Sequence, residues 1–231
     1  MRRRTYLTVG ALAGLVAAAL IAASLLGARD TQQASAQELS GSDAATLLQG
    51  VPQSGSTLGR PGAPVTLVEF ADLQCPYCAQ WSGQTFAEIV RDYVRPGKVR
   101  IVFAGLAFIG PDSDRALRFA AAAGRQGKLW QVVDLLYANQ GGENSGWANE
   151  ELLRSVGAAV PDLRVEQALG ETSSPAVDRQ LAAARDLSTR LGVRGTPAFA
   201  ATRTGAPLAA IRVTSLGADG LRPTLDRLLE P

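Results

Sequence analysis

Residues Val65 to Cys78 read VTLVEFADLQCPYC, an apolar run followed by a short turn and a C-x-x-C motif. The run is almost continuously apolar, as strands are when helices cover both faces of a parallel sheet. Pro76 follows the first cysteine, and proline suits the first helical turn because the N–H it lacks would be unpaired there anyway. The stretch therefore predicts a buried strand, a turn, and a helix that opens at the cysteine pair.

Cys75 and Cys78 are the only cysteines in the chain, and their spacing favours redox chemistry. Residues i and i+3 of a helix have Cβ atoms about 5–6 Å apart, close to the ~4 Å separation in a disulfide. Such a bond closes a loop of about four residues and would stabilise the fold by only roughly 2 kcal/mol. A helix N-terminus also stabilises a thiolate. We expect Cys75 to be the exposed nucleophile and Cys78 the resolving thiol.

Other uses of two cysteines are a structural disulfide or a metal site. A zinc site needs about four ligands, and the chain has two cysteines and no histidine. A Cu(I) site built from two thiolates is chemically sound and remains the alternative function, a copper-binding or metallochaperone module. The absence of histidine also excludes Ser-His-Asp and Cys-His hydrolases. On the oxidoreductase interpretation, neither a cofactor nor a metal is expected.

The N-terminus carries Arg2, Arg3 and Arg4 before an uncharged run that ends near residue 27. About twenty helical residues span the ~30 Å of a bilayer's hydrocarbon core, and the arginines should stay in the cytoplasm. We therefore predict a single-pass membrane anchor at 1–27, with the catalytic domain on the extracytoplasmic side. The alternative is a signal segment cleaved after an A-x-A site, which gives a secreted or periplasmic protein. Both place the cysteines in an oxidising compartment.

Residues 28–57 are rich in Gln, Ser, Ala and Gly and predict a flexible tether, with a short helical turn near 43–49. The net charge is +2, and three positive charges lie in the N-terminal arginines, so the remainder is close to neutral. Electrostatics therefore give no reason to expect nucleic-acid binding.

The rest of the chain alternates helical and strand patterns. Asp112 or Ser113 can cap a helix, and capping explains Asp112 and Asp114 better than a catalytic carboxylate pair does. Trp81 and Tyr93 fit core positions. The predicted elements after the cysteines are helix 79–94, strand 99–104, helices 114–125, 128–139, 149–156, 163–169 and 176–191, strands 198–202 and 209–214, and helix 219–229.

Glu69 interrupts the apolar strand and allows two interpretations. If the strand is buried on both faces, the carboxyl group is buried too and its pKa rises. It is then a candidate proton acceptor for Cys78. If the strand lies at an edge, Glu69 simply faces water.

The chain resembles the DsbA-like branch of the thioredoxin superfamily over about residues 58–229. The resemblance rests on Glu69 six residues before Cys75, the Cys-Pro-Tyr-Cys helix start, a helical insertion, and a Gly-Thr-Pro sequence at 195–197 before a hairpin and a final helix. It implies an α/β thioredoxin-like domain at 58–231, ordered βαβ, helical insertion (about 112–192) and ββα.

The same resemblance assigns roles to individual residues. It implies that Pro197 is cis and lies beside the cysteines, and that Thr196 offers backbone groups to an extended substrate peptide. It implies a buried Glu69 that relays protons to the resolving cysteine. Pro76 and Tyr77, between the cysteines, are further expected substrate contacts.

Strongly oxidising members of that family carry histidine between the cysteines, and this chain does not. We therefore expect a thiolate that is less stabilised and a protein that is less oxidising. The expected function is disulfide exchange with cysteine-containing protein substrates, in the oxidase direction rather than the reductase direction. The expected partner is a membrane protein that re-oxidises the cysteine pair, and a quinone link suits that role. We expect a monomer.

Overall fold

The computed structural model describes residues 44–230, which belong to one compact unit. The predicted anchor or signal segment, 1–27, and the first part of the predicted tether lie outside these residues. Among residues 44–230, no helix has both the length and the apolar composition needed to cross a bilayer.

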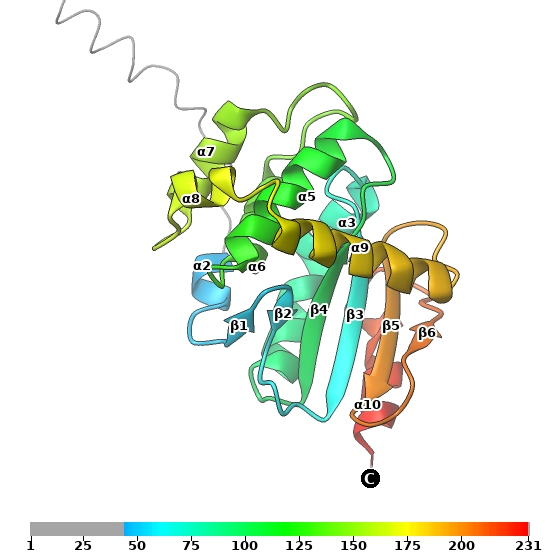
Figure 1. The fold of residues 1–231 in the computed structure, drawn as a ribbon. Helices are drawn as coiled ribbons and strands as arrows, with labels where there is room; N and C mark the ends of the chain where they lie inside the picture. Colours follow the sequence, from blue (N-terminus) through cyan, green and yellow to red (C-terminus); the bar gives the residue numbers. More distant parts are fainter. Residues whose placement is uncertain (1–43, 231) are drawn as a thin grey trace, which may run out of the picture. The chain divides into compact units, whose positions relative to one another are not determined.

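A twisted sheet forms the middle of the unit, with helices on both of its faces (Figure 1). In chain order the elements are α2 (Ala44–Leu47), β1 (Gln53–Ser54), β2 (Thr57–Leu58), β3 (Val65–Ala71), α3 (Pro76–Trp81), η1 (Ser82–Phe86), α4 (Ala87–Ile89), η2 (Val90–Val94), β4 (Val99–Gly105), α5 (Pro111–Gly124), α6 (Leu129–Ala138), α7 (Glu150–Ala159), α8 (Val165–Gly170), α9 (Pro175–Arg190), β5 (Ala198–Arg203), β6 (Ala209–Ile211), η3 (Ala218–Gly220) and α10 (Arg222–Leu229).

The strand order is β1-β2-β4-β3-β5-β6, so β3 lies inside the sheet. It runs parallel to β4 and antiparallel to β5. All seven residues of β3 are buried, as the apolar run predicted. The predicted order of strand, helix, strand, helical insertion, hairpin and final helix is confirmed.

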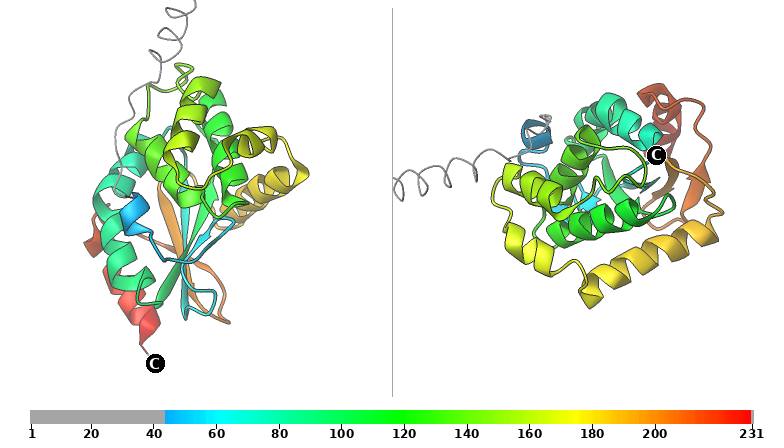
Figure 2. Two further views of the ribbon diagram at one scale, coloured as in Figure 1. Left: turned by 90° about the vertical axis from the view of Figure 1, so that its left-hand side faces the viewer. Right: turned by 90° about the horizontal axis from the view of Figure 1, so that it is seen from above.

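The two faces of the sheet have separate apolar cores because successive strand residues point to opposite sides. Leu67 and Ala71 of β3 pack with the continuous helical run 76–94, in which η1 and η2 are π-helical turns. Val68 and Phe70 pack with residues of α9 on the other face. Figure 2 shows the helical run and α10 on one side of the sheet and α9 on the other.

The predicted tether does not extend to residue 57. From Ala44 the chain forms α2, within the predicted helical turn, and then the hairpin β1–β2, whose second strand pairs with β4. Leu48 and Leu58 are buried. The polar composition was misleading because β1 is an outer strand that exposes polar side chains, while few apolar residues fix the segment to the core.

If the hairpin is part of the domain, Leu58→Ala should destabilise it strongly, because Leu58 is fully buried. We expect the free energy of unfolding to fall by about 3 kcal/mol, as for other buried leucines. Urea denaturation of the purified protein measures this. The control Ser54→Ala changes an exposed residue of the same hairpin and should shift stability by less than about 0.5 kcal/mol. Equal, small effects of both variants would mean that the hairpin is only loosely attached.

Candidate active site

The cysteine pair lies where β3 ends and α3 begins. The Cys75 N–H donates to the Asp72 carbonyl (3.0 Å), and the Cys75 carbonyl accepts from the N–H groups of Cys78 and Ala79 (both 3.1 Å). Cys75 is therefore the N-cap of α3, and Pro76 is its first residue, as predicted. The unpaired N–H groups of this first turn create a positive potential at the Cys75 sulfur.

The two sulfurs differ in access less than the sequence suggested. Both cysteines are free thiols in this structure. Cys75 exposes only 5% of its surface and Cys78 none. The expectation of an exposed Cys75 is therefore wrong in degree, because the chain segment at Thr196 lies against the sulfur. Cys75 is still the more accessible of the two.

The environment shifts the two thiol pKa values in opposite directions. The pKa of Cys75 falls to about 6, chiefly because Cys78 donates a hydrogen bond to its thiolate; bonds from Thr196 and from the backbone of Cys78 and Tyr77 add to this against an opposing effect of burial. The pKa of Cys78 rises far above its usual range because the thiol is buried and faces the Cys75 thiolate. Near neutral pH the charge therefore resides on Cys75.

Strand pairing brings Thr196 and Pro197 to the cysteines. In the antiparallel pair of β3 and β5, Phe70 lies opposite Ala198, so the residues before Ala198 lie beside the end of β3. The Thr196–Pro197 peptide bond is cis, as the resemblance implied. The Cys75 thiol donates to the Thr196 carbonyl (3.2 Å).

Glu69 is buried, as expected for a strand that is covered on both faces. It is 1% exposed and lies between Phe103 of β4 and Phe199 of β5 in the sheet. Its Oε2 has no hydrogen-bond partner among the described residues. Burial in these apolar surroundings raises the pKa of Glu69 to about 8. The carboxyl group is therefore mostly protonated at neutral pH.

Sequence reasoning missed the polar network that holds the turn before Cys75. The fully buried Asp72 carboxylate accepts four hydrogen bonds: Oδ1 from the Gln74 N–H (2.8 Å) and the Ser113 hydroxyl (2.5 Å), Oδ2 from the N–H groups of Phe108 and Ile109 (2.7 and 3.0 Å). Ser113 was expected as a helix cap, but α5 starts earlier, at Pro111, so the hydroxyl is free to turn toward Asp72.

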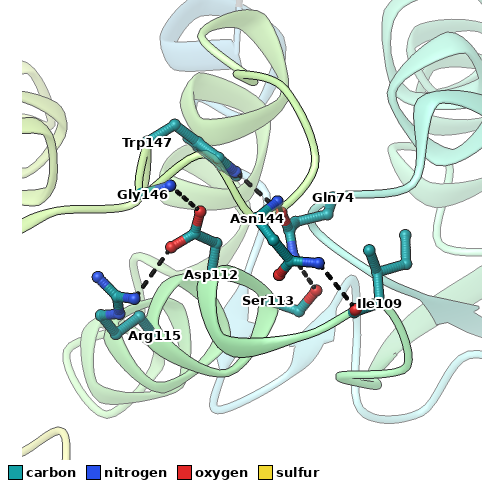
Figure 3. A network of polar contacts seen from close by, with 8 residues as sticks. All are labelled: Gln74, Ile109, Asp112, Ser113, Arg115, Asn144, Gly146 and Trp147. Carbon is teal, nitrogen blue, oxygen red and sulfur yellow. Dashed lines mark hydrogen bonds and ion pairs between the residues drawn. The ribbon is translucent and has the colours of Figure 1, made fainter.

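Gln74 extends the network to the loop between α6 and α7 (Figure 3). Its amide NH2 donates to Ser113 (2.9 Å) and to the Asn144 side chain (3.1 Å). Its amide oxygen accepts from the Asn144 N–H (2.6 Å) and the Trp147 indole (3.3 Å). Gln140 of the same loop donates to the carbonyls of Leu73 and, at 3.3 Å, Cys75. A polar turn after a buried strand was the only sequence signal for these contacts.

The other residues that the sequence analysis considered make ion pairs or lie in the core, away from any carboxylate pair. Asp112 accepts from the Gly146 N–H and pairs with Arg115, and Asp114 pairs with Arg118, so they do not form a carboxylate pair. Trp81 and Tyr93 are in the core. Within residues 44–230 no cluster of three or more His, Cys, Asp or Glu side chains could hold a metal ion.

Two large apolar side chains stand out on the surface of this region. Tyr77, inside the C-x-x-C motif, is 62% exposed, and Phe108 is 51% exposed. The Phe108 N–H donates to Asp72 Oδ2, so the network that holds the turn before Cys75 also holds the Phe108 backbone.

The chain is similar to known proteins in both sequence and fold. The family model described as thioredoxin matches residues 53–204. The probable disulfide bond formation protein D of Bacillus cereus is 33% identical over 144 residues, 61% of this chain and 67% of that protein, so the match spans about two thirds of the relative's length. A thioredoxin-like oxidoreductase from Silicibacter pomeroyi aligns with 27% identity, a TM-score of 0.55, and coverage of 80% of this chain and 97% of that one.

The crystal structure of oxidised BdbD from Bacillus subtilis has the same fold. It aligns with a TM-score of 0.66 and 21% identity over 79% of this chain and 97% of the BdbD chain.

If Cys78 is the main cause of the low Cys75 pKa, removing its thiol should raise that pKa. We expect the ultraviolet thiolate absorbance of the reduced wild type to titrate with a midpoint near pH 6. In Cys78→Ala the midpoint should move upward. The reciprocal variant Cys75→Ala is the control and should show no thiolate titrating at neutral pH. An unchanged midpoint in Cys78→Ala would contradict the assignment.

Burial of Glu69 should make the reduced protein lose stability as pH rises. The folded state holds the Glu69 proton up to about pH 8, whereas the unfolded chain releases it near pH 4.5. Between these values the folded state binds more protons, so the free energy of unfolding decreases with pH, by about 1.4 kcal/mol per pKa unit. Denaturation of wild type and Glu69→Gln between about pH 4.5 and 6, below the range in which Cys75 ionises, should show the decrease only in wild type. The exposed control Glu143→Gln should behave like wild type.

The family match is supported by a cysteine pair whose thiol pKa values are shifted in opposite directions and by the adjoining Thr196–Pro197 segment. The chain belongs to the thioredoxin family as a DsbA-like thiol–disulfide oxidoreductase.

Proposed function

We propose that this protein oxidises cysteine pairs of substrate proteins outside the cytoplasm, with Cys75 as nucleophile and leaving group and Cys78 as the resolving thiol. The asymmetry of the two thiols carries the proposal: the Cys75 thiolate is stabilised and that of Cys78 is not. A stabilised Cys75 thiolate favours the reduced protein and makes its disulfide more oxidising.

In the oxidative cycle, a substrate thiolate attacks the Cys75 sulfur of the Cys75–Cys78 disulfide. The bond between the two cysteines breaks, and Cys78 leaves as a buried thiolate. Glu69, which holds its proton up to about pH 8, gives that proton to Cys78. A second substrate thiolate then attacks the substrate sulfur of the mixed disulfide, and Cys75 leaves as a thiolate. The substrate loses two electrons and the protein gains them.

The substrate contacts follow from the surface around Cys75. Thr196 and Pro197 are half-buried beside the sulfur and can present backbone groups to an extended peptide. Tyr77 and Phe108 offer exposed apolar area to such a chain, and Pro76, which follows Cys75 in the sequence, is also exposed.

An oxidase needs an electron acceptor to regenerate its disulfide. We propose a membrane redox partner that supplies a disulfide or a quinone. The N-terminal arginines and the uncharged run support an extracytoplasmic domain held at the membrane. The name of the Bacillus cereus relative, which refers to disulfide bond formation, supports an oxidising compartment.

The oxidase assignment predicts a reduction potential between ~−270 mV for thioredoxin and ~−120 mV for DsbA, because the pKa of about 6 for Cys75 lies between their values of about 7 and 3.5. Equilibration with a glutathione series measures it. A potential at or below that of thioredoxin would favour a reductase.

Cysteine variants separate the two thiol roles. Cys75→Ser should abolish oxidation of a reduced, unfolded substrate protein. Cys78→Ser should instead form mixed disulfides with reduced substrate in the presence of an external oxidant, because Cys75 alone can still react. Tight stoichiometric Cu(I) binding to the reduced wild type, without disulfide exchange, would overturn the proposal in favour of the copper-binding module.

A further inference from the structure

A small cavity of about 10 Å³ lies against Glu69 in the core. Its lining includes Trp81, Ser82, Trp130 and Asp134, so it lies between β3, the helical run after Cys78, and α6. This volume is close to the minimum that holds one water molecule, and a buried water also needs polar partners.

The polar atoms needed for a water are present in the lining residues. Glu69 Oε2, Trp81 Nε1 and Trp130 Nε1 are buried and have no hydrogen-bond partner among the described residues. They comprise one carboxyl oxygen and two N–H donors, a set that one water molecule can satisfy. Buried groups of this kind are rarely left unpaired in folded proteins.

The cavity also opens a polar path toward the surface. The Ser82 hydroxyl donates to Asp134 Oδ1 at 3.4 Å. Ser82 is buried, whereas Asp134 is half-buried on α6. The lining thus runs from an enclosed carboxyl group through a hydroxyl to a carboxylate that reaches solvent.

We propose that this cavity binds one water molecule and that the water, Ser82 and Asp134 conduct protons between Glu69 and solvent. The proposal rests on the proposed role of Glu69 as proton donor to Cys78. After that transfer the Glu69 carboxylate takes a proton from the water, the water takes one from the Ser82 hydroxyl, Ser82 takes one from Asp134, and Asp134 takes one from solvent. The re-oxidation step runs the same transfers in reverse.

Another titratable side chain, Tyr137, also lines the cavity. Cys75, Cys78 and Asp72 lie near Tyr137, whose buried phenol has a raised pKa, caused first by burial and then by these charges and that of Glu69. The Tyr137 hydroxyl donates to the Asp72 carbonyl, toward the interior. Tyr137→Phe is therefore the variant that tests a rival path.

The experiment follows the Glu69 proton directly. The carboxylic acid C=O stretch shifts when its proton is replaced by deuterium, so rapid mixing of the reduced full chain with D2O at about pH 6, below the Glu69 pKa, gives the exchange rate by infrared absorption. Glu69→Gln identifies the band by removing it. We expect Ser82→Ala and Asp134→Asn to slow exchange at least roughly tenfold, since positioned proton transfer is typically worth 10²–10⁴.

Matched variants separate a proton route from a disturbed fold. Trp130→Phe keeps a ring but removes the indole N–H and should also slow exchange. Asp134→Glu should restore it. Asp186→Asn, which removes an exposed carboxylate of α9 on the other face of the sheet, should leave the rate unchanged. If Asp134→Asn does not fold, Ser82→Ala and Trp130→Phe still decide the question.

Unchanged exchange in Ser82→Ala and Asp134→Asn would overturn the route, as would slowing by Tyr137→Phe alone. Failure of the proposed function is a different result: wild-type protein that exchanges no disulfides, or Glu69→Gln that reduces and re-oxidises as fast as wild type. The infrared exchange rate does not depend on either outcome.

Discussion

The position of Cys75 depends on the hydrogen bonds that hold the turn between β3 and α3. Asp72 alone accepts four of them, and its carbonyl accepts the Cys75 N–H. Most of the donors come from the helical insertion or the segment that leads into it. The insertion therefore does more than cover the sheet, because it also holds the turn between the end of β3 and the start of α3. A thiolate at a helix N-terminus is stabilised only while that point stays in place.

Two buried carboxyl groups, three residues apart, have opposite surroundings. Asp72 has its lone pairs satisfied by N–H and O–H donors, whereas Glu69 has an oxygen with no partner among the described residues. A carboxylate surrounded by donors is suited to holding a backbone turn. A carboxyl group among aromatic rings is easier to protonate and so can exchange a proton near neutral pH. The same strand end thus combines a fixed anchor with a group that can change its charge.

The sequence predicted the fold and the central pair well because those features have local causes. A continuous apolar run indicates an inner strand, and Cys-Pro at a helix start indicates a thiol near positive potential. Glu69 could be assigned only by resemblance, since burial depends on the strands at its sides. Gln74, Gln140 and Asn144 could not be identified because their partners lie about 65 to 70 positions away in the chain. The hairpin at 53–58 was missed because an outer strand needs few apolar residues.

The β1–β2 hairpin, which pairs with β4, also determines how easily another extended chain could add to the sheet. It leaves β1, with two residues, as one outer strand of the described sheet, and β6, with three residues, as the other. Outer strands this short offer few free backbone groups for another chain to join. The described sheet is therefore a poor template for the growth of fibrils from other extended chains.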